Sequence, residues 1–400
     1  MERTKQTILL LILAGVCGVW SGCAASGRTS KKEQMLKTWE KSSIGPNLAA
    51  VRGLLDRGQV EEAKKLLVKY IQTEPEHPEV NYLLARVHLA EGRLPAAQAC
   101  LKKAVDGAPQ MDEAWFALGL TALEQGRLEE AAKSLGKTVE LKPLQVEYIL
   151  TLSHCYVRLG RIEQALDLIE TKRRTLPYDT DLLLTAADLA QRSGDGERAA
   201  ALYKEALWRQ GDNPRVLEAV GLHYMDRQLW VPAAELFEKL YRIQAGQERR
   251  QMTLRWLSYC TLQAGRYAAA LKWYDELSVL RRDDPQVWLE MGQAALGADL
   301  PDRALYCGQK ALQLQPGLMD AQVVTACALY LKNNYAEAVA LFQKVCLDSK
   351  WEAFGWWMSG LCYQRLGQNA LARSAFEKAS QLNPDSPLIR LFTEPEKKTL

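Results

Sequence analysis

Residues 356–384, WWMSGLCYQRLGQNALARSAFEKASQLNP, contain the pattern that decides the fold. Gly367 separates two apolar stretches, and Pro384 follows the second. A glycine can take a positive φ and so end one helix, whereas a proline cannot continue the next. The small residues Gly360 and Ala372 allow two helices to approach closely. This stretch therefore predicts a helical hairpin.

The same pattern recurs along most of the chain. An alanine returns at a constant spacing, with one longer step after position 233, at positions 63, 97, 131, 165, 199, 233, 270, 304, 338 and 372. One hairpin cannot bury its own apolar stripe, so neighbouring hairpins must stack. The repeats predict an all-α solenoid of about ten helical hairpins over residues 44–386. The break in period near residues 246–250 is a place for a bend or a boundary between subarrays.

The last repeat resembles the tetratricopeptide repeat (TPR). The resemblance lies in Trp356, Gly360, Tyr363, Gly367, Ala372, Phe376, Ala379 and Pro384. Ten repeats in register extend it over residues 44–386. It implies a right-handed superhelix that acts as a non-catalytic, protein-binding scaffold.

Composition and charge exclude several other classes of protein. A chain that is 48% hydrophobic and 25% charged is not disordered over most of its length. The 51 Lys and Arg against 48 Asp and Glu leave a net charge of only +3, which disfavours nucleic-acid binding. Seven of the nine cysteines follow Cys23, and none makes a C-x-x-C pair. We therefore expect no metal site and no cofactor, and interpret these cysteines as small core residues.

Enzyme motifs are imitated by the repeats. Residues 194–199, GDGERA, fit a dinucleotide-binding pattern, but they fall in a predicted turn between two helices and follow no strand. Residues 136–138, GKT, resemble the end of a phosphate-binding loop, but they lie inside a predicted helix. No G-x-S-x-G or H-E-x-x-H motif occurs. The sequence predicts no catalytic residue and no enzyme.

Residues 1–22 have the layout of a signal peptide. Arg3 and Lys5 precede an uninterrupted apolar run from Ile8 to Val19. That run is shorter than the roughly 20 residues that a spanning helix needs. This segment is therefore predicted to direct export.

The end of this segment resembles a bacterial lipobox. Ser21, Gly22 and Cys23 are similar to the site at which the cysteine is lipidated and becomes the mature N-terminus. The resemblance implies a lipid anchor on Cys23, and Ala24 resembles the residue that directs such proteins to the outer membrane. We expect a bacterial envelope protein, facing the periplasm from the outer membrane. The alternatives are an inner-membrane location, plain signal cleavage or an uncleaved anchor.

The segments that flank the repeats are predicted to tether and cap the solenoid. Residues 23–43 are polar and lysine-rich, typical of a lipidated tether with a possible N-terminal cap. Residues 387–400 are predicted to form a C-terminal cap and tail, as the exposed end of a solenoid requires.

The TPR resemblance also implies a partner-binding groove on the first helix of each hairpin. With the repeated alanine counted as position 20, family members usually present positions 2, 5, 9, 12 and 13 there. The candidates are Arg52, Tyr82, Arg86, Phe116, Leu120, His154, Arg158, Tyr259, Tyr330, Phe354 and Trp357. No repeat has the Lys at position 5 or the Asn at position 9 of the family's carboxylate clamp. The groove thus predicts an apolar or acidic amphipathic partner, unless these residues only pack neighbouring first helices.

The expected function is a scaffold lipoprotein of a cell-envelope assembly. The resemblance allows pilus or secretin, cell-wall or polysaccharide-export machinery. The alternative is an accessory subunit or regulator of a periplasmic or cytoplasmic enzyme complex.

Overall fold

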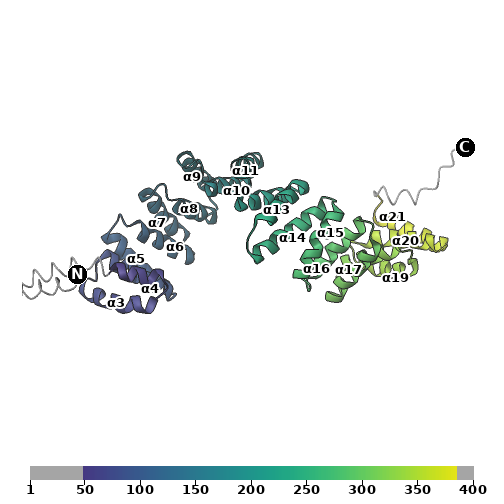
Figure 1. Cartoon of the computed structure of the whole chain (residues 1–400), viewed down its shortest axis with the longest axis horizontal. Helices are drawn as coiled ribbons and strands as arrows, with labels where there is room; N and C mark the ends of the chain where they lie inside the picture. Colours follow the sequence, from purple (N-terminus) through teal and green to yellow (C-terminus); the bar gives the residue numbers. More distant parts are fainter. Residues whose placement is uncertain (1–47, 385–400) are drawn as a thin grey trace, which may run out of the picture. The chain divides into compact units, whose positions relative to one another are not determined.

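The computed structural model describes residues 48–384, and they form helices joined by short turns, without a strand among them. These residues belong to two compact units that divide between Pro177 and Tyr178 (Figure 1). The helices pair into four hairpins in the first unit and six in the second. The predicted all-α solenoid of about ten hairpins is confirmed. Cys23, the predicted tether and the predicted C-terminal cap lie outside the described residues.

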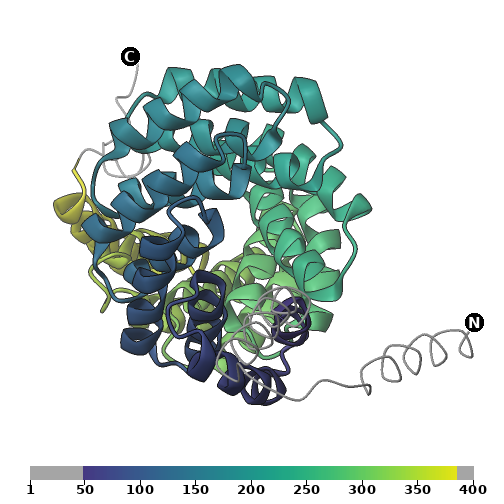
Figure 2. The same cartoon turned by 90° about the vertical axis from the view of Figure 1, so that its left-hand side faces the viewer.

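The first unit begins with a helix over residues 48–56. Within this unit, each hairpin packs on the next one along the chain, as Figure 2 shows from the side of this unit. The helices that follow are α3 (Val60–Thr73), α4 (Pro78–Ala90), α5 (Leu94–Gly107), α6 (Asp112–Glu124), α7 (Leu128–Leu141), α8 (Val146–Arg158) and α9 (Ile162–Thr175).

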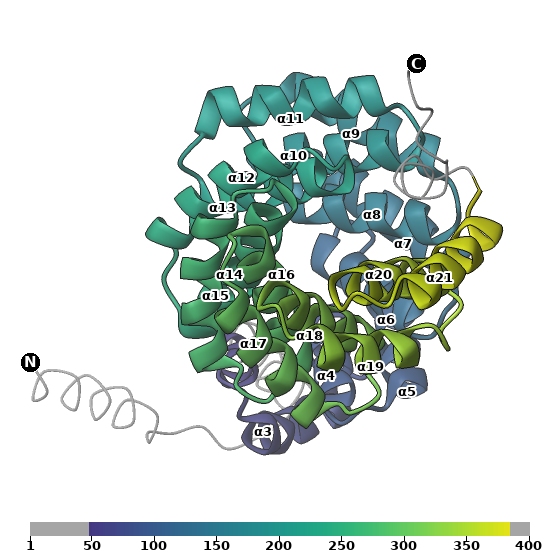
Figure 3. The same cartoon turned by 90° about the vertical axis from the view of Figure 1, so that its right-hand side faces the viewer.

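The second unit repeats this arrangement, and its successive hairpins can be followed in Figure 3. Its first helices are α10 (Thr180–Arg192), α12 (Pro214–Asp226), α14 (Gln247–Gln263), α16 (Pro285–Gly297), α18 (Met319–Leu331) and α20 (Glu352–Arg365). Their partners, the second helices, are α11 (Gly196–Gln210), α13 (Trp230–Ile243), α15 (Tyr267–Leu280), α17 (Pro301–Leu314), α19 (Tyr335–Val345) and α21 (Asn369–Leu382).

Small side chains allow the two helices of each hairpin to pack closely. The repeated alanines are buried in all ten hairpins. Position 8 carries Gly119 in α6, and a Cβ added there would lie 2.7 Å from Cδ2 of Leu135 in α7. The helices therefore approach as closely as the sequence pattern predicts, because no larger side chain separates them.

The turn inside each hairpin needs a left-handed backbone. Seven repeats place a glycine there, and its φ lies between 71° and 88°. The other three place Gln228, Asp299 and Asn333 at φ values of 57°, 56° and 64°. A residue with a Cβ pays about 1–2 kcal/mol for this conformation. The repeat geometry therefore holds even where the sequence departs from glycine.

We expect Gln228→Gly to stabilise the second unit by about 1 kcal/mol, because glycine removes the strain of the left-handed turn. Chemical denaturation followed by circular dichroism measures this change. The effect of Asn333→Gly should be smaller, since asparagine tolerates this conformation better than glutamine does. Gly126→Ala, at a φ of 75°, should destabilise the chain. Lower stability of Gln228→Gly would contradict the assigned strain.

The break in period lengthens one helix. Helix α14 has 17 residues, whereas α12 and α16 have 13, and it begins after Gly246 at a φ of 99°. A single hydrophobic cluster continues across this point from Leu217 to Ala328. The extra residues are thus added at the start of α14, within one continuous core.

A buried ion pair joins first helices α14 and α16. Arg255 Nη2 donates to Glu290 Oε1 at 2.8 Å, and only 5% of the Glu290 side chain is exposed. The Tyr274 hydroxyl donates to Glu290 Oε2 at 2.8 Å, and Gln286 Nε2 donates to Oε1 at 2.9 Å. Three donors therefore compensate the buried carboxylate, as burial of a charge requires.

Candidate binding groove

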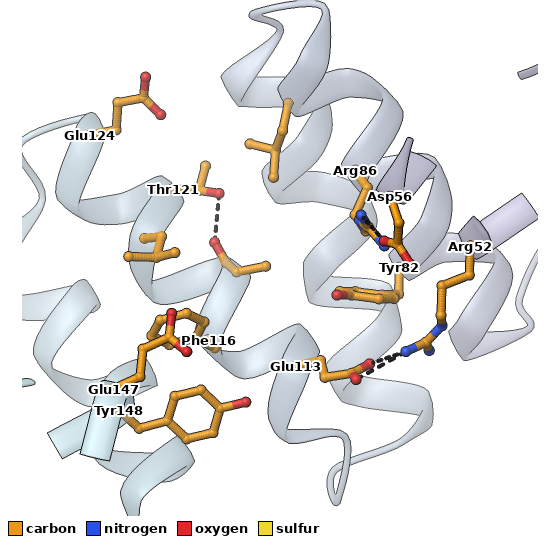
Figure 4. Close-up of a pocket in the computed structure, with 13 residues that line it drawn as sticks. Arg52, Asp56, Tyr82, Arg86, Glu113, Phe116, Thr121, Glu124, Glu147 and Tyr148 are labelled. Carbon is orange, nitrogen blue, oxygen red and sulfur yellow. Dashed lines mark hydrogen bonds and ion pairs between the residues drawn. The ribbon is translucent and has the colours of Figure 1, made fainter. Parts of the chain in front are cut away.

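A groove of about 850 Å³ lies on the first helices of the first unit (Figure 4). It crosses the helix over residues 48–56 and helices α4, α6 and α8. Its walls are formed by Arg52, Asp56, Tyr82, Arg86, Leu89, Glu113, Phe116, Ala117, Leu120, Thr121, Glu124, Glu147 and Tyr148. Five of the residues predicted from the sequence, Arg52, Tyr82, Arg86, Phe116 and Leu120, are among them.

The repeat period brings these residues together. Positions 5, 9 and 13 lie on one face of a helix, because each follows the last by about one helical turn. Stacked hairpins then align the faces of consecutive first helices. Residues that lie one repeat apart, such as Tyr82 and Phe116, thereby become neighbours along one groove.

Aromatic rings form the apolar part of the groove. The rings of Phe116 and Tyr148 have their centroids 4.6 Å apart. Tyr82 is buried, Phe116 is half-buried, and Leu120 is 41% exposed. The Tyr148 hydroxyl donates to Asp112 Oδ2 at 2.9 Å. Burial, assisted by this carboxylate, raises the pKa of Tyr148, so its ring remains neutral.

Both arginines of the groove are already paired. Arg52 donates to the two carboxylate oxygens of Glu113 at 3.0 and 2.9 Å and to Glu79 at 3.3 Å. Arg86 Nη2 lies 2.8 Å from Asp56 Oδ1. Burial lowers the pKa of Arg52, but its carboxylate partners outweigh that effect and raise it. An acidic segment of a partner would therefore compete with carboxylates of the chain itself for these arginines.

The lining of the groove carries more carboxylates than arginines, so its net charge is negative. Its lining has two arginines against Asp56, Glu113, Glu124 and Glu147, a formal net charge of −2. Within residues 48–384, neither Glu124 nor Glu147 forms an ion pair. The groove thus presents an apolar floor with two available acceptors for a cation.

Other predicted residues lie elsewhere. His154 and Arg158 are exposed on α8 but do not line the groove, and Arg158 Nη1 donates to the Leu123 carbonyl at 3.3 Å. The sequence predicted both to continue the line of groove residues. Both lie away from the groove in the structure. Helix α8 lines the groove only with its first turn, whereas His154 and Arg158 lie in its last turns.

Four predicted residues belong to the second unit, where all are half-buried. Tyr259 packs edge-on against Trp230, and Tyr330 packs edge-on against Tyr335, at 5.8 and 5.5 Å between centroids. Phe354 and Trp357, predicted to be exposed to a partner, instead lie 6.1 Å apart in an aromatic cluster that includes Phe342. Packing within and between neighbouring hairpins therefore covers part of each of these side chains.

Half of the lining residues that sequence reasoning missed are acidic. Glu79, Glu113 and Glu147 occupy position 2 of three successive repeats, and two of them line the groove. Position 2 is one of those that the TPR resemblance assigns to the groove. This run of three glutamates was therefore the signal that could have identified the charge of the groove.

Burial raises the pKa of every thiol among the described residues. All seven cysteines between residues 48 and 384 are unpaired. Burial raises the pKa of Cys260 and of Cys327 to about 12, which keeps them protonated. No group of His, Cys, Asp and Glu in this part of the chain is arranged to hold a metal ion. Among these helices, none is both long and apolar enough to cross a membrane.

Three family models match four stretches of the chain. One tetratricopeptide-repeat model matches residues 54–119 and 122–173, and a second matches residues 184–248. The middle TPR-like domain of cilia and flagella-associated protein 70 matches residues 254–383. No enzyme family is indicated, and TPR proteins generally act as protein-interaction scaffolds.

Individual relatives are distant. The protein CTR9 homolog of Arabidopsis thaliana is 26% identical over 121 residues, which is 30% of this chain and 11% of that protein. A tetratricopeptide repeat protein from Parabacteroides merdae is 18% identical, with a TM-score of 0.42, over 62% of this chain and 96% of that one. A chain of the APC/C hetero-tetramer Cut9-Hcn1 is 18% identical, with a TM-score of 0.38, over 76% of this chain and 60% of that one. The family matches and the hairpin geometry together show that this chain is built of tetratricopeptide repeats.

Proposed function

We propose that the chain is a non-catalytic scaffold that binds a partner protein through the groove of its first unit. The observation that supports this most is the combination of an aromatic floor with two available carboxylates, Glu124 and Glu147, on consecutive first helices. Such a surface suits an amphipathic segment with apolar residues on one side and lysines or arginines beside them. Half-buried aromatic residues are typical anchors of protein interfaces.

The expected contribution of each side chain to the binding free energy decides which variants are informative. An exposed ion pair contributes about 0.2–1 kcal/mol, whereas an aromatic anchor can contribute about 2 kcal/mol or more. Phe116 should therefore dominate affinity, and the two glutamates should decide which charge the partner carries. Charge reversal at both glutamates doubles their effect, because attraction becomes repulsion.

The test uses a synthetic amphipathic peptide with leucines on one face and lysines on the other, and a matched peptide with glutamates for lysines. We expect the lysine peptide to bind more tightly in fluorescence anisotropy. Phe116→Ala should weaken binding by about 2 kcal/mol, and Glu124→Lys with Glu147→Lys by tenfold or more, with unchanged circular dichroism. Glu62→Lys, on the exposed face of α3, is the matched control and should have no effect.

Three outcomes would contradict this proposal. Tighter binding of the glutamate peptide would instead favour the acidic partner expected from the sequence. Equal affinity of all the groove variants would place the site elsewhere. Loss of helicity in Phe116→Ala would show that the ring packs the hairpins and does not serve as an anchor.

We further propose that a lipid on Cys23 holds this scaffold at a bacterial cell envelope, where it organises an assembly such as pilus or secretin, cell-wall or polysaccharide-export machinery. The support is the sequence pattern alone, with its apolar run and the lipobox-like Ser21, Gly22 and Cys23. Several acyl chains on one cysteine would satisfy the need for more than one anchor in stable membrane attachment.

We expect Cys23→Ser to move the protein from the membrane fraction to the soluble fraction. Mass spectrometry of the wild-type N-terminus should find acyl groups on Cys23. Cys100→Ser, within the described repeats, is the control and should remain with the membrane. A Cys23→Ser protein that stays with the membrane, together with an unmodified wild-type N-terminus, would exclude the lipid anchor.

A further inference from the structure

The second unit has a groove of about 630 Å³ on a different face of its hairpins. It lies between the second helices α15 and α17, which are neighbours in Figure 3, and the start of α16 contributes to it. The groove of the first unit, in contrast, is formed by first helices only. A partner on α15 and α17 would therefore leave the first helices of the same hairpins accessible.

The apolar part of this groove is a corner formed by the edge-on rings of Trp288 and Tyr306, with Val279 beside them. Trp288 Nε1 donates to the carbonyl of Arg282 at 2.8 Å, which fixes the indole. The Tyr306 ring stands edge-on to it, with 5.9 Å between centroids and an interplanar angle of 80°. Val279 is 60% exposed and Tyr306 is 53% exposed, so both present area that a partner can cover. An aliphatic or aromatic side chain fits such a corner without reorganising it.

The charge of this second groove is opposite to that of the first. Among the described residues, neither Arg282 nor Lys310 forms an ion pair, and Lys310 Nζ donates to the neutral Gln313 at 3.0 Å. Asp283 is the one carboxylate of its lining, which leaves a net charge of +1. Asp284 is not part of the lining and already lies 3.7 Å from Arg281. Two cations thus flank the aromatic corner without carboxylate partners.

We propose that this groove binds an acidic peptide segment of a partner protein. One aliphatic or aromatic side chain of the segment packs against Trp288 and Tyr306, and flanking carboxylates pair with Arg282 and Lys310. Apolar area and charge are both needed, because two exposed ion pairs alone contribute little. The net charge of +1 is too small to favour a nucleic acid or an anionic membrane over a peptide.

The test is a random-peptide library displayed on phage and selected on the full chain. We expect enrichment of peptides that have Asp or Glu beside a large apolar residue, and the strongest is then synthesised for fluorescence anisotropy. Its affinity should fall tenfold or more in Arg282→Glu with Lys310→Glu, and also in Tyr306→Ala. Lys272→Glu, exposed on the same α15 but outside the groove, is the matched control and should bind normally.

Other outcomes would overturn the proposal. A poly-glutamate peptide that binds as tightly as the selected one would show attraction by charge alone. If a single-stranded oligonucleotide or vesicles with anionic lipid displaced the selected peptide as well as the unlabelled peptide does, binding would likewise depend on charge alone. Undiminished binding to the charge-reversed variant would exclude this groove. Because Phe116→Ala should leave this peptide's affinity unchanged, failure here is distinguishable from failure at the groove of the first unit.

Discussion

Arg255→Met is expected to lower the free energy of unfolding of the second unit by about 3 kcal/mol. The substitution leaves the Glu290 carboxylate buried without its guanidinium partner, and 5% exposure of that side chain gives water little access. Tyr274 and Gln286 still donate to it, so the expected loss is at the lower end for a broken buried pair. Denaturant unfolding measures the loss, and hydrogen exchange should locate it in α14, α15 and α16.

A second variant separates the buried charge from lost packing. Arg255→Met combined with Glu290→Gln removes both charges and keeps an oxygen that can accept from Tyr274. It should recover about half of the loss or more, because the unpaired charge causes most of the cost. Arg266→Met, at an exposed pair with Glu235, is the control and should cost less than about 1 kcal/mol. A loss at Arg255 no larger than at Arg266 would show that the pair contributes little.

The hairpins could be predicted because their determinants are local. Each determinant is visible within one repeat. Glycine marks the turn with a positive φ, a small residue marks the close approach of two helices, and proline marks the end of the second helix. Gln228, Asp299 and Asn333 follow the same backbone without glycine, because stacking against both neighbours fixes the geometry. The period alone did not reveal the division between Pro177 and Tyr178, which falls inside an uninterrupted series of repeats.

The groove could be predicted only in part. Its aromatic and aliphatic residues follow from repeat position, but the partners of its arginines do not. Arg52 pairs with Glu113, which is 61 residues away, so the contact depends on how three hairpins stack. Trp357 shows the opposite problem, since position 5 suggested exposure and the neighbouring aromatic residues cover it in part. Charge and exposure therefore required the tertiary structure, whereas the face of the helix did not.

Gly221→Ala should destabilise the second unit by about 2 kcal/mol, because an added methyl group overpacks the contact between two helices. A Cβ on Gly221 in α12 would lie 2.7 Å from Cε1 and 2.8 Å from Cζ of Phe237 in α13. The Phe237 ring is completely buried and cannot move aside without disturbing the core. Overpacking of this kind costs about 1–3 kcal/mol, and the intrinsic preference of alanine for a helix returns only about 1 kcal/mol at most. Denaturation followed by circular dichroism measures the net effect.

Gly136→Ala gives the matched control, because Gly136 also lies inside a helix, α7, but an added Cβ meets nothing within 4 Å. It should stabilise the first unit by about 0.5–1 kcal/mol through helix preference alone. Phe237→Leu should partly rescue Gly221→Ala, so that the double variant loses less than the sum of the single losses. Each hairpin contacts mainly its neighbours, so hydrogen-exchange protection should fall chiefly from α10 to α15. A uniform loss of protection across all the repeats would instead mean that the chain unfolds as one cooperative core, in which the effect of a single close approach is not local.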